Sequence, residues 1–196
     1  PIFWDELKTE EDTKRFVNLV FQLSGGKEKS RMTARVTQRD VGTWNTLLCC
    51  ASNDSLLDFV TSRTRMTTAG LYRVFEYEVE PGREGQIDPS EAQRIIARLN
   101  DNFGVVGLEY AKWLGANFAQ IDVEVGDFLK DLGQEVGGHN DERFWLSLIT
   151  VILLGARYAN QLGFTDIDED RLKEFMLDVL ARMRAERAGQ PIDMKD

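Results

Sequence analysis

Near its start the chain reads Ile2-Phe3-Trp4-Asp5-Glu6, three apolar residues that lead directly into two carboxylates. A short apolar run of this kind predicts a buried strand, and ligands bind at the carboxyl ends of strands in an open α/β sheet. The same pattern also fits a strand followed by an acidic helix start, because carboxylates stabilise helix N-termini. This stretch taken alone leaves both interpretations open.

A second apolar run, from Trp44 to Ala51, predicts another buried strand, which we expect to lie beside the first and parallel to it. Asn53 follows this run. Parallel pairing would therefore place its amide near the carboxylates of Asp5 and Glu6. Asn53 is equally suited to cap a short helix expected from Ser55 to about Val60.

The two halves of the chain differ in pattern. Residues 1–80 mix a helix expected from about Thr9 to Leu23 with strands, the clearest of which is the alternating run from Leu71 to Val79. Turn-forming residues dominate the linker at 81–87. The remainder, 88–196, shows helical periodicity and predicts helices near 88–100, 104–115, 120–136, 141–162 and 168–187. We therefore predict an α/β part over 1–80 and an all-α domain over 88–196.

Charge is unevenly distributed along the chain. The net charge of −9 argues against nucleic-acid binding by the molecule as a whole. The segment 27–39, which we expect to be a loop or hairpin, is nevertheless basic and has Glu28 as its single acid. It could contact a polyanion, or it could be a solvated loop whose charges pair with acids elsewhere. Its basic residues are Lys27, Lys29, Arg31, Arg35 and Arg39.

The cysteines, the single histidine and the longest apolar stretch narrow the classes of protein to which the chain could belong. Cys49 and Cys50 are adjacent, so on a strand they point to opposite faces; we expect reduced thiols and a cytoplasmic protein. The single histidine, His139, has no cysteine–histidine cluster around it and is expected in a loop. The apolar stretch from Phe144 to Ala156 is too short to span a bilayer and predicts a buried helix, so we expect no membrane partner.

The order of these features resembles the later part of a P-loop ATPase core of the RecA/AAA+-like class, in which an Asp-Glu strand precedes a helix, a basic loop and a strand ending in a polar residue. It is most similar to the helicase-like ATPase domains of phage and prophage primase–helicase proteins. The stretches that carry the resemblance are Gly25-Gly26-Lys27-Glu28-Lys29-Ser30-Arg31-Met32, Thr43-Trp44-Asn45-Thr46-Leu47-Leu48 and Asn102-Phe103-Gly104-Val105-Val106-Gly107. The implied fold is a partial P-loop sheet followed by the all-α domain.

The phosphate loop of that family, G-x-x-x-x-G-K-[ST], does not occur in this sequence. The stretch from Gly25 to Ser30 has the right residue types but the wrong spacing, and it follows a helix where a phosphate loop follows a strand. We therefore expect the chain to be a fragment that binds magnesium–ATP weakly by itself.

The resemblance implies roles for individual residues. Asp5 would hold Mg²⁺, Glu6 would orient the attacking water, and Asn53 would sense the γ-phosphate of ATP. One arginine would reach the nucleotide of a neighbouring subunit in a homo-oligomer, although each candidate is also a plausible surface residue. The candidates are Arg63, Arg65 and Arg73.

Two functions follow as expectations. The first is an ATP-hydrolysing motor, a helicase or primase–helicase of phage-type DNA replication, whose basic segment 27–39 contacts single-stranded DNA. The second is a non-enzymatic helical partner module with a degenerate ATPase core. The missing phosphate loop and the acidic helical half favour the second.

Overall fold

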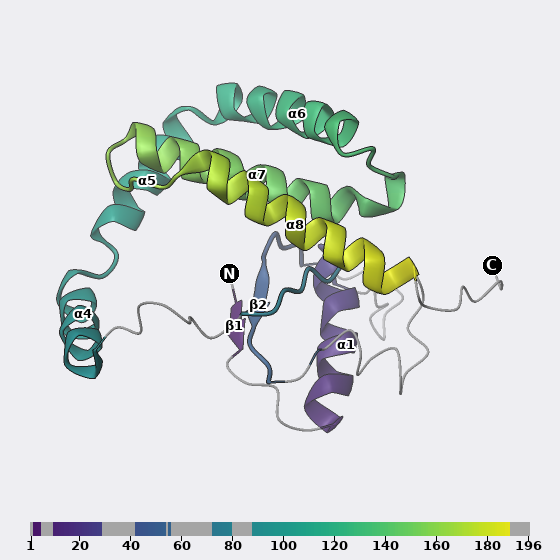
Figure 1. Cartoon of the computed structure of the whole chain (residues 1–196), viewed down its shortest axis with the longest axis horizontal. Coiled ribbons are helices and arrows are strands. Elements are labelled where there is room, and N and C mark those ends of the chain that lie inside the picture. Colours follow the sequence, from purple (N-terminus) through teal and green to yellow (C-terminus); the bar gives the residue numbers. More distant parts are fainter. Residues whose placement is uncertain are drawn as a thin grey trace, which may run out of the picture. The chain divides into compact units, whose positions relative to one another are not determined.

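A computed structural model of the chain describes residues 2–4, 10–28, 42–53, 55, 72–79 and 88–188. They belong to two compact units: the first holds the described residues up to Glu76, and the second is Tyr77–Ala188. In chain order the elements of Figure 1 are β1 (Ile2–Trp4), α1 (Glu10–Ser24), β2 (Leu48–Cys50), α4 (Pro89–Asn102), α5 (Val105–Ala116), α6 (Phe118–Glu135), the 3-10 helix η1 (Asn140–Glu142), α7 (Arg143–Gln161) and α8 (Glu169–Ala188).

The first unit contains a two-stranded parallel sheet. β1 pairs with β2 in the register Ile2–Leu48, Phe3–Cys49 and Trp4–Cys50. Backbone hydrogen bonds extend the ladder at both ends: the N–H of Ile2 donates to the Leu47 carbonyl at 2.8 Å, and the N–H of Ala51 donates to the Trp4 carbonyl at 3.2 Å. The predicted parallel pairing of these two segments is therefore confirmed.

Helix α1 supplies the small core of the first unit. Phe16 and Val20 are buried one turn apart, and Trp4, Leu48 and Val74 pack against them. The helix ends before Gly26, whose φ of 63° lies in the left-handed region that glycine adopts without strain. The indole N–H of Trp44 donates to the Leu23 carbonyl at 3.1 Å and so satisfies one of the unpaired carbonyls at the helix end.

The prediction of a partial P-loop α/β sheet followed by an all-α domain is wrong. The described residues are mostly helical, with 69% helix, and the sheet that they form has two strands. The apolar run at 44–51 forms a strand only at Leu48–Cys50. The alternating run at 71–79 forms no strand over its described part, 72–79. Alternation makes a segment suitable for a sheet, but a strand also needs a hydrogen-bonding neighbour, and no described segment pairs with this one.

The expected burial of β1 is wrong as well. Phe3 is 76% exposed and Ile2 is 46% exposed, whereas Trp4 packs on the core. Successive side chains of a strand point to opposite faces, so a sheet that rests on a helix on one side buries only half of them. The buried-strand interpretation requires cover on both faces, which is typical of larger parallel sheets.

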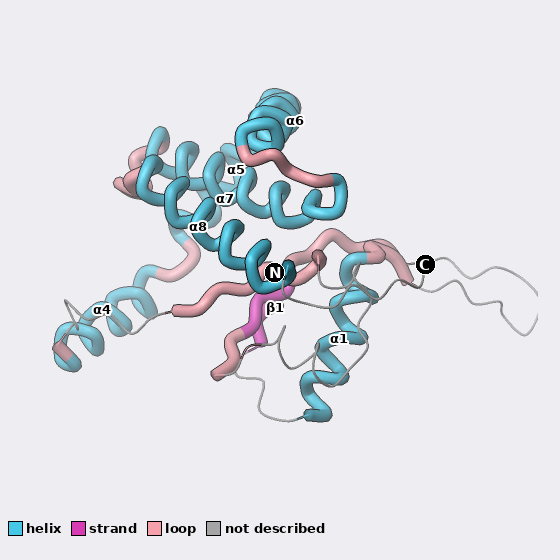
Figure 2. The backbone as a smooth tube through the Cα atoms, turned by 45° about the vertical axis from the view of Figure 1, so that its right-hand side comes forward, coloured by secondary structure: helices cyan, strands magenta, loops and turns pink. Residues whose placement is uncertain are grey.

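The second unit contains a bundle in which α7 contacts both α6 and α8 (Figure 1 and Figure 2). Its most buried side chains are Ile149 and Thr150 on α7, each 0% exposed, and Leu180 on α8, which is 1% exposed. The other buried apolar residues are Leu132, Trp145, Leu146, Leu153, Leu154, Ala156, Tyr158, Met176, Val179 and Met183. Leu132 lies on α6 and the others lie on α7 and α8, where helical spacing gathers them into apolar faces that pack together.

The helices predicted over 88–187 are confirmed to within a few residues. Asp88 caps α4, as expected, and its Oδ1 accepts a hydrogen bond from the Ser90 backbone N–H at 2.8 Å. Hydrogen bonds from the Ser90 hydroxyl and then from its backbone N–H lower the pKa of Asp88, because they stabilise the charged carboxylate. Among the helices that the structure describes, none combines the length and apolar character that a membrane crossing needs.

Candidate functional site

The carboxyl edge of the β1–β2 pair is the first site that the sequence indicates. Because Trp4 faces Cys50 in a parallel register, the chain leaves both strands at the same edge. Ser52 and Asn53 follow β2 there and are exposed. Asp5 and Glu6 follow β1 but lie outside the described residues. The catalytic and magnesium-binding roles of this edge therefore remain predictions.

Cys49 and Cys50 lie next to this edge as free thiols. Burial raises the pKa of the Cys50 thiol, and the negative charges of Glu76 and of Cys49 raise it further. The thiolate is the nucleophilic form of cysteine, so a raised pKa keeps Cys50 protonated and unreactive at neutral pH. Cys50 is exposed, and nothing in its described surroundings lowers the pKa of its thiol.

Of the basic segment, the structure describes only Lys27 and Glu28. Lys27 is exposed and forms an isolated antiparallel bridge with Thr43. The N–H of Glu28 donates to the Gly42 carbonyl at 2.8 Å, so the described residues on either side of 29–41 are paired. Its other basic residues, Lys29, Arg31, Arg35 and Arg39, lie outside the described residues, as do Arg63 and Arg65; Arg73 is described as half-buried in a turn. The nucleic-acid contact and the arginine role remain predictions.

In the second unit the most buried charge is the carboxylate of Glu142, which is 3% exposed. Arg184 of α8 donates to its two oxygens at 2.8 and 2.6 Å, and a third Arg184 N–H donates to the Val136 carbonyl at 3.0 Å. These hydrogen bonds from Arg184 are the largest cause that lowers the pKa of Glu142. The pair joins α8 to the corner between α6 and α7, which is a structural role.

His139 takes part in the same corner. Its side chain accepts a hydrogen bond from the Glu142 backbone N–H, while the Glu142 side chain accepts one from the His139 backbone N–H at 3.1 Å. This reciprocal arrangement is a capping box, in which two backbone donors at a helix start are satisfied together. His139 lies at the start of η1, which agrees with its expected position between helices.

A second network joins α6 to α7. The Tyr158 hydroxyl donates to Glu124 at 2.5 Å, and the Gln120 amide donates to the same carboxylate group at 2.7 Å. Burial and the Glu124 hydrogen bond raise the pKa of Tyr158 to about 12. The Tyr158 hydrogen bond in turn is the largest cause that lowers the pKa of Glu124. Both pKa shifts favour a neutral tyrosine and a charged carboxylate, which are the protonation states in which Tyr158 donates and Glu124 accepts.

The described residues hold no group of three or more His, Cys, Asp and Glu side chains placed to bind a metal ion. The two carboxylates described above are both engaged by neighbouring helices. One stretch of the surface of the second unit is unusual.

Helices α4 and α5 bury none of their residues. Large apolar side chains are exposed along this stretch, and we call them the α4–α5 stripe: Ile95, Ile96, Leu99, Phe103, Val105, Val106 and Leu108, with exposures from 40% for Ile95 to 84% for Phe103. Between the two helices Gly104 has a φ of 79°, a left-handed conformation that ends one helix and lets the next begin. Contiguous exposed apolar surface of this kind marks interaction sites.

The second half of α5, in contrast, is anchored. The Tyr110 hydroxyl donates to the Gly155 carbonyl of α7 at 3.0 Å, and the Trp113 ring lies 5.3 Å from the Tyr158 ring. The stripe is thus attached to a packed bundle at one end. Sequence reasoning predicted both helices but not the exposed stripe, because spacing identifies an apolar face without identifying what covers it. A signal was present in the run of apolar residues from Ile95 to Leu108.

Comparisons with known proteins identify no relative of this chain: no protein-family model, no curated protein and no solved structure matches it.

Proposed function

We propose that this chain is a non-enzymatic assembly module whose helical unit binds another protein through the α4–α5 stripe. The observation that carries the proposal is the concentration of exposed large apolar side chains along 95–108, although single ones such as Phe118 and Val123 are exposed elsewhere in the unit. Ile149 and Leu180 in the bundle are 0% and 1% exposed, whereas Leu99 and Phe103 are 63% and 84% exposed. Monomeric proteins rarely leave large contiguous apolar patches in water, because covering them is favourable.

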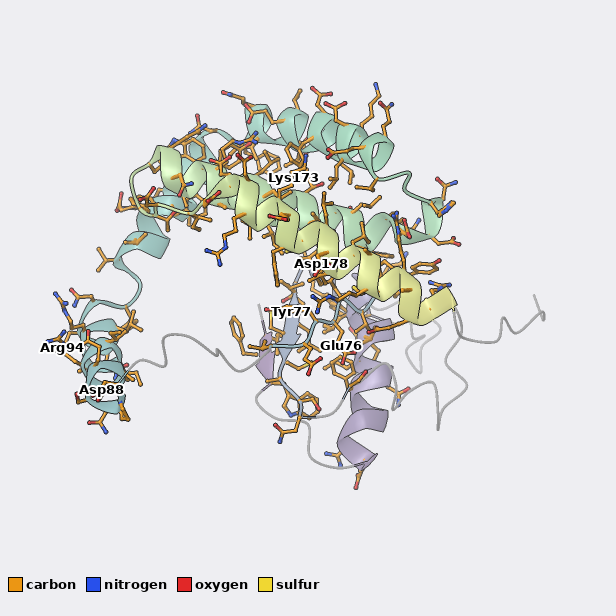
Figure 3. All side chains as sticks on the ribbon, viewed as in Figure 1. Glu76, Tyr77, Asp88, Arg94, Lys173 and Asp178 are labelled. Carbon is orange, nitrogen blue, oxygen red and sulfur yellow. The ribbon has the colours of Figure 1, made fainter. Side chains whose placement is uncertain are left out.

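The polar networks support the same function. Glu142 with Arg184, and Glu124 with Tyr158, connect elements of the bundle to one another. They make the bundle a firm support for a surface, since a partner that docks on a preorganised element loses less conformational entropy. On α4, Arg94 pairs with Glu91 of the same helix at 2.5 Å, so these two charges are satisfied without a partner protein. Figure 3 shows Asp88 and Arg94 on this helix.

The test is the mass of the assembly that contains the chain. A tagged chain isolated under native conditions from the cells that encode it should run in native mass spectrometry well above its own 22.3 kDa. Leu99→Glu should return it to the mass of the single chain, because a buried unpaired carboxylate opposes assembly. A wild-type chain recovered at 22.3 kDa would overturn the proposal.

A second candidate is the ATP-dependent work on nucleic acid that the sequence resemblance implies. One observation favours it: β1 and β2 are parallel neighbours, so the chain leaves both strands at one edge, next to Asn53. The test is hydrolysis of magnesium–ATP by the protein at its full natural length. Asp5→Asn and Glu6→Gln should each abolish turnover, and unchanged turnover would remove this candidate.

A further inference from the structure

The geometry of α4 points to a second copy of this chain as the protein that covers the stripe: we propose that α4 pairs antiparallel with α4 of another copy. This inference rests on the proposed function and names its partner. It is argued from spacing, size and charge along Pro89–Asn102 and the residue that follows.

Apolar residues occur along α4 at coiled-coil spacing. We call four of these residues the seam: Ala92, Ile96, Leu99 and Phe103. They are separated by four, three and four residues, which is the alternation of core positions in a heptad repeat. Ile95 is 40% exposed beside this seam and widens it by one residue. A seam with this spacing is suited to one neighbouring helix, whereas the face of a helix in a globular core is broader. The spacing thus predicts a single helical partner.

The sizes of the seam residues are complementary only when a copy runs in the opposite direction. An antiparallel partner centred between Ala97 and Arg98 places Ile96 opposite Leu99 and the small Ala92 opposite the large Phe103. Both contacts then occur twice because the arrangement has two-fold symmetry. A parallel partner would instead set two Phe103 rings together at one layer and leave two Ala92 side chains facing a gap at another.

Charge permits this arrangement. The charged residues of α4, namely Glu91, Arg94, Arg98 and Asp101, lie at the heptad positions farthest from the seam. The positions that flank the seam carry neutral amides, such as Gln93 and Asn100, which can hydrogen-bond across it. From 89 to 116 acids and bases are equal in number, so two copies meet without net repulsion there although each chain carries −9.

The contact is short, which sets the expected affinity. A helix of 14 residues is roughly 21 Å long, so the pair lies near the low end of specific interfaces. Val105 and Val106 at the start of α5 are also exposed, at 65% and 51%, but they belong to a separate helix that begins after Gly104. We expect reversible dimers with a dissociation constant on the order of 1–10 µM.

The first experiment is sedimentation equilibrium of the pure full-length chain at concentrations around this range. Wild type should give twice the monomer mass of 22.3 kDa as the concentration rises. Ile96→Glu should weaken dimerisation at least about 30-fold, the loss typical of a central contact residue. Ala97→Glu is the matched control: it places the same side chain one residue away, on the opposite face of α4, and should leave the dimer intact. Because α4 buries no residue, both variants should keep the wild-type circular dichroism spectrum.

A second experiment tests the direction of pairing. In a chain with Cys49→Ser and Cys50→Ser, the pair Ala92→Cys with Phe103→Cys should form a disulfide-linked dimer under mild oxidation. The two positions are about 16 Å apart within one helix, beyond the reach of an internal disulfide. Ala92→Cys alone should not link, because antiparallel pairing separates the two copies of this residue by a similar distance. Linkage by Ala92→Cys alone would overturn the antiparallel arrangement, because only a parallel pair brings the two copies of this residue together.

The outcomes separate this inference from the proposed function. A wild-type chain that stays monomeric up to about 100 µM, far above the expected dissociation constant, overturns self-pairing. Equal weakening by Ile96→Glu and Ala97→Glu also overturns it. If, in addition, the assembly from native cells is still lost with Leu99→Glu, the stripe binds a different protein and the proposed function stands.

Discussion

Helices α4 and α7 both carry apolar residues at helical spacing, yet these residues are exposed on α4 and buried on α7. On α7, Trp145, Ile149 and Leu153 are buried between α6 and α8. On α4, Ile96 and Leu99 occupy the corresponding kind of position and are 56% and 63% exposed. Periodicity therefore shows that a helix has an apolar face, but the partner of that face is decided by the rest of the chain or by another molecule.

The sharpest way to test this difference is to make the same change in both helices. Ile149→Ala should lower the free energy of unfolding by about 3 kcal/mol, because it opens a cavity where Ile149 is wholly buried. Ile96→Ala, measured at concentrations low enough to keep the chain monomeric, should change it by less than about 0.5 kcal/mol. Urea unfolding followed by circular dichroism would measure both. A large loss for Ile96→Ala would show that α4 is packed within its own chain.

Arg184→Ala, a substitution in the bundle, should cause the next largest loss in the free energy of unfolding. It removes both hydrogen bonds to Glu142, whose side chain is 4% exposed, and leaves that carboxylate without its cation. Arg184 itself is 31% exposed, so we expect a loss of about 2 kcal/mol, below the range for fully buried pairs. The same urea titration checks it. The matched control Arg182→Ala removes a surface pair with Asp178 and should change stability by less than about 0.5 kcal/mol.

Acid should weaken the bundle through the same carboxylate. The folded-state pKa of Glu142 lies below its ordinary value of 4.5. Its contribution to stability is therefore fully present above 4.5 and is lost as the pH falls through the lowered folded-state value. Thermal melting between pH 6 and pH 3 should show this slope in wild type and a shallower one in Glu142→Gln. Equal slopes in the two proteins would assign the acid sensitivity to other groups.

Tyr158→Phe should give the smallest of these effects. The substitution keeps the ring that packs on Trp113 and removes only the hydroxyl that donates to Glu124. We expect a loss of about 1 kcal/mol, as for a single hydrogen bond. Wild-type stability should also fall as the pH rises from the ordinary tyrosine value of 10 to about 12, since the folded state retains the Tyr158 proton. This alkaline slope should be reduced in the variant.

The features that the sequence could predict are those set by interactions between residues close together in the chain. Helices α4 to α8 were located to within a few residues because caps and 3.6-residue spacing are local. Phe144 was expected to begin a buried helix but is 37% exposed, so the buried part of that helix starts at Trp145.

The sheet depends on contacts between segments far apart in the chain, and the sequence predicted it only in part. Its parallel pairing was predicted from two apolar runs that end in polar residues, and the register of β1 against β2 confirms it. The wider α/β architecture was wrong because the number of strands depends on which segments find partners far along the chain. The α4–α5 stripe was not recognised for a similar reason, since exposure is a property of the folded unit. Asp5 and Glu6 lie outside the described residues, so their roles remain predictions.

The bridge between Lys27 and Thr43 has a consequence for how this protein can change over evolution. It fixes the two ends of the intervening segment against each other, with the Glu28 and Trp44 backbone N–H groups bonded on either side. These two anchor points are therefore held together at a fixed place on the first unit. In general, the entropy of joining two fixed ends by a flexible connection grows only slowly with its length, by about 0.6 kcal/mol for each doubling. Insertions and deletions between these anchor points should accumulate with little effect on the unit that carries them.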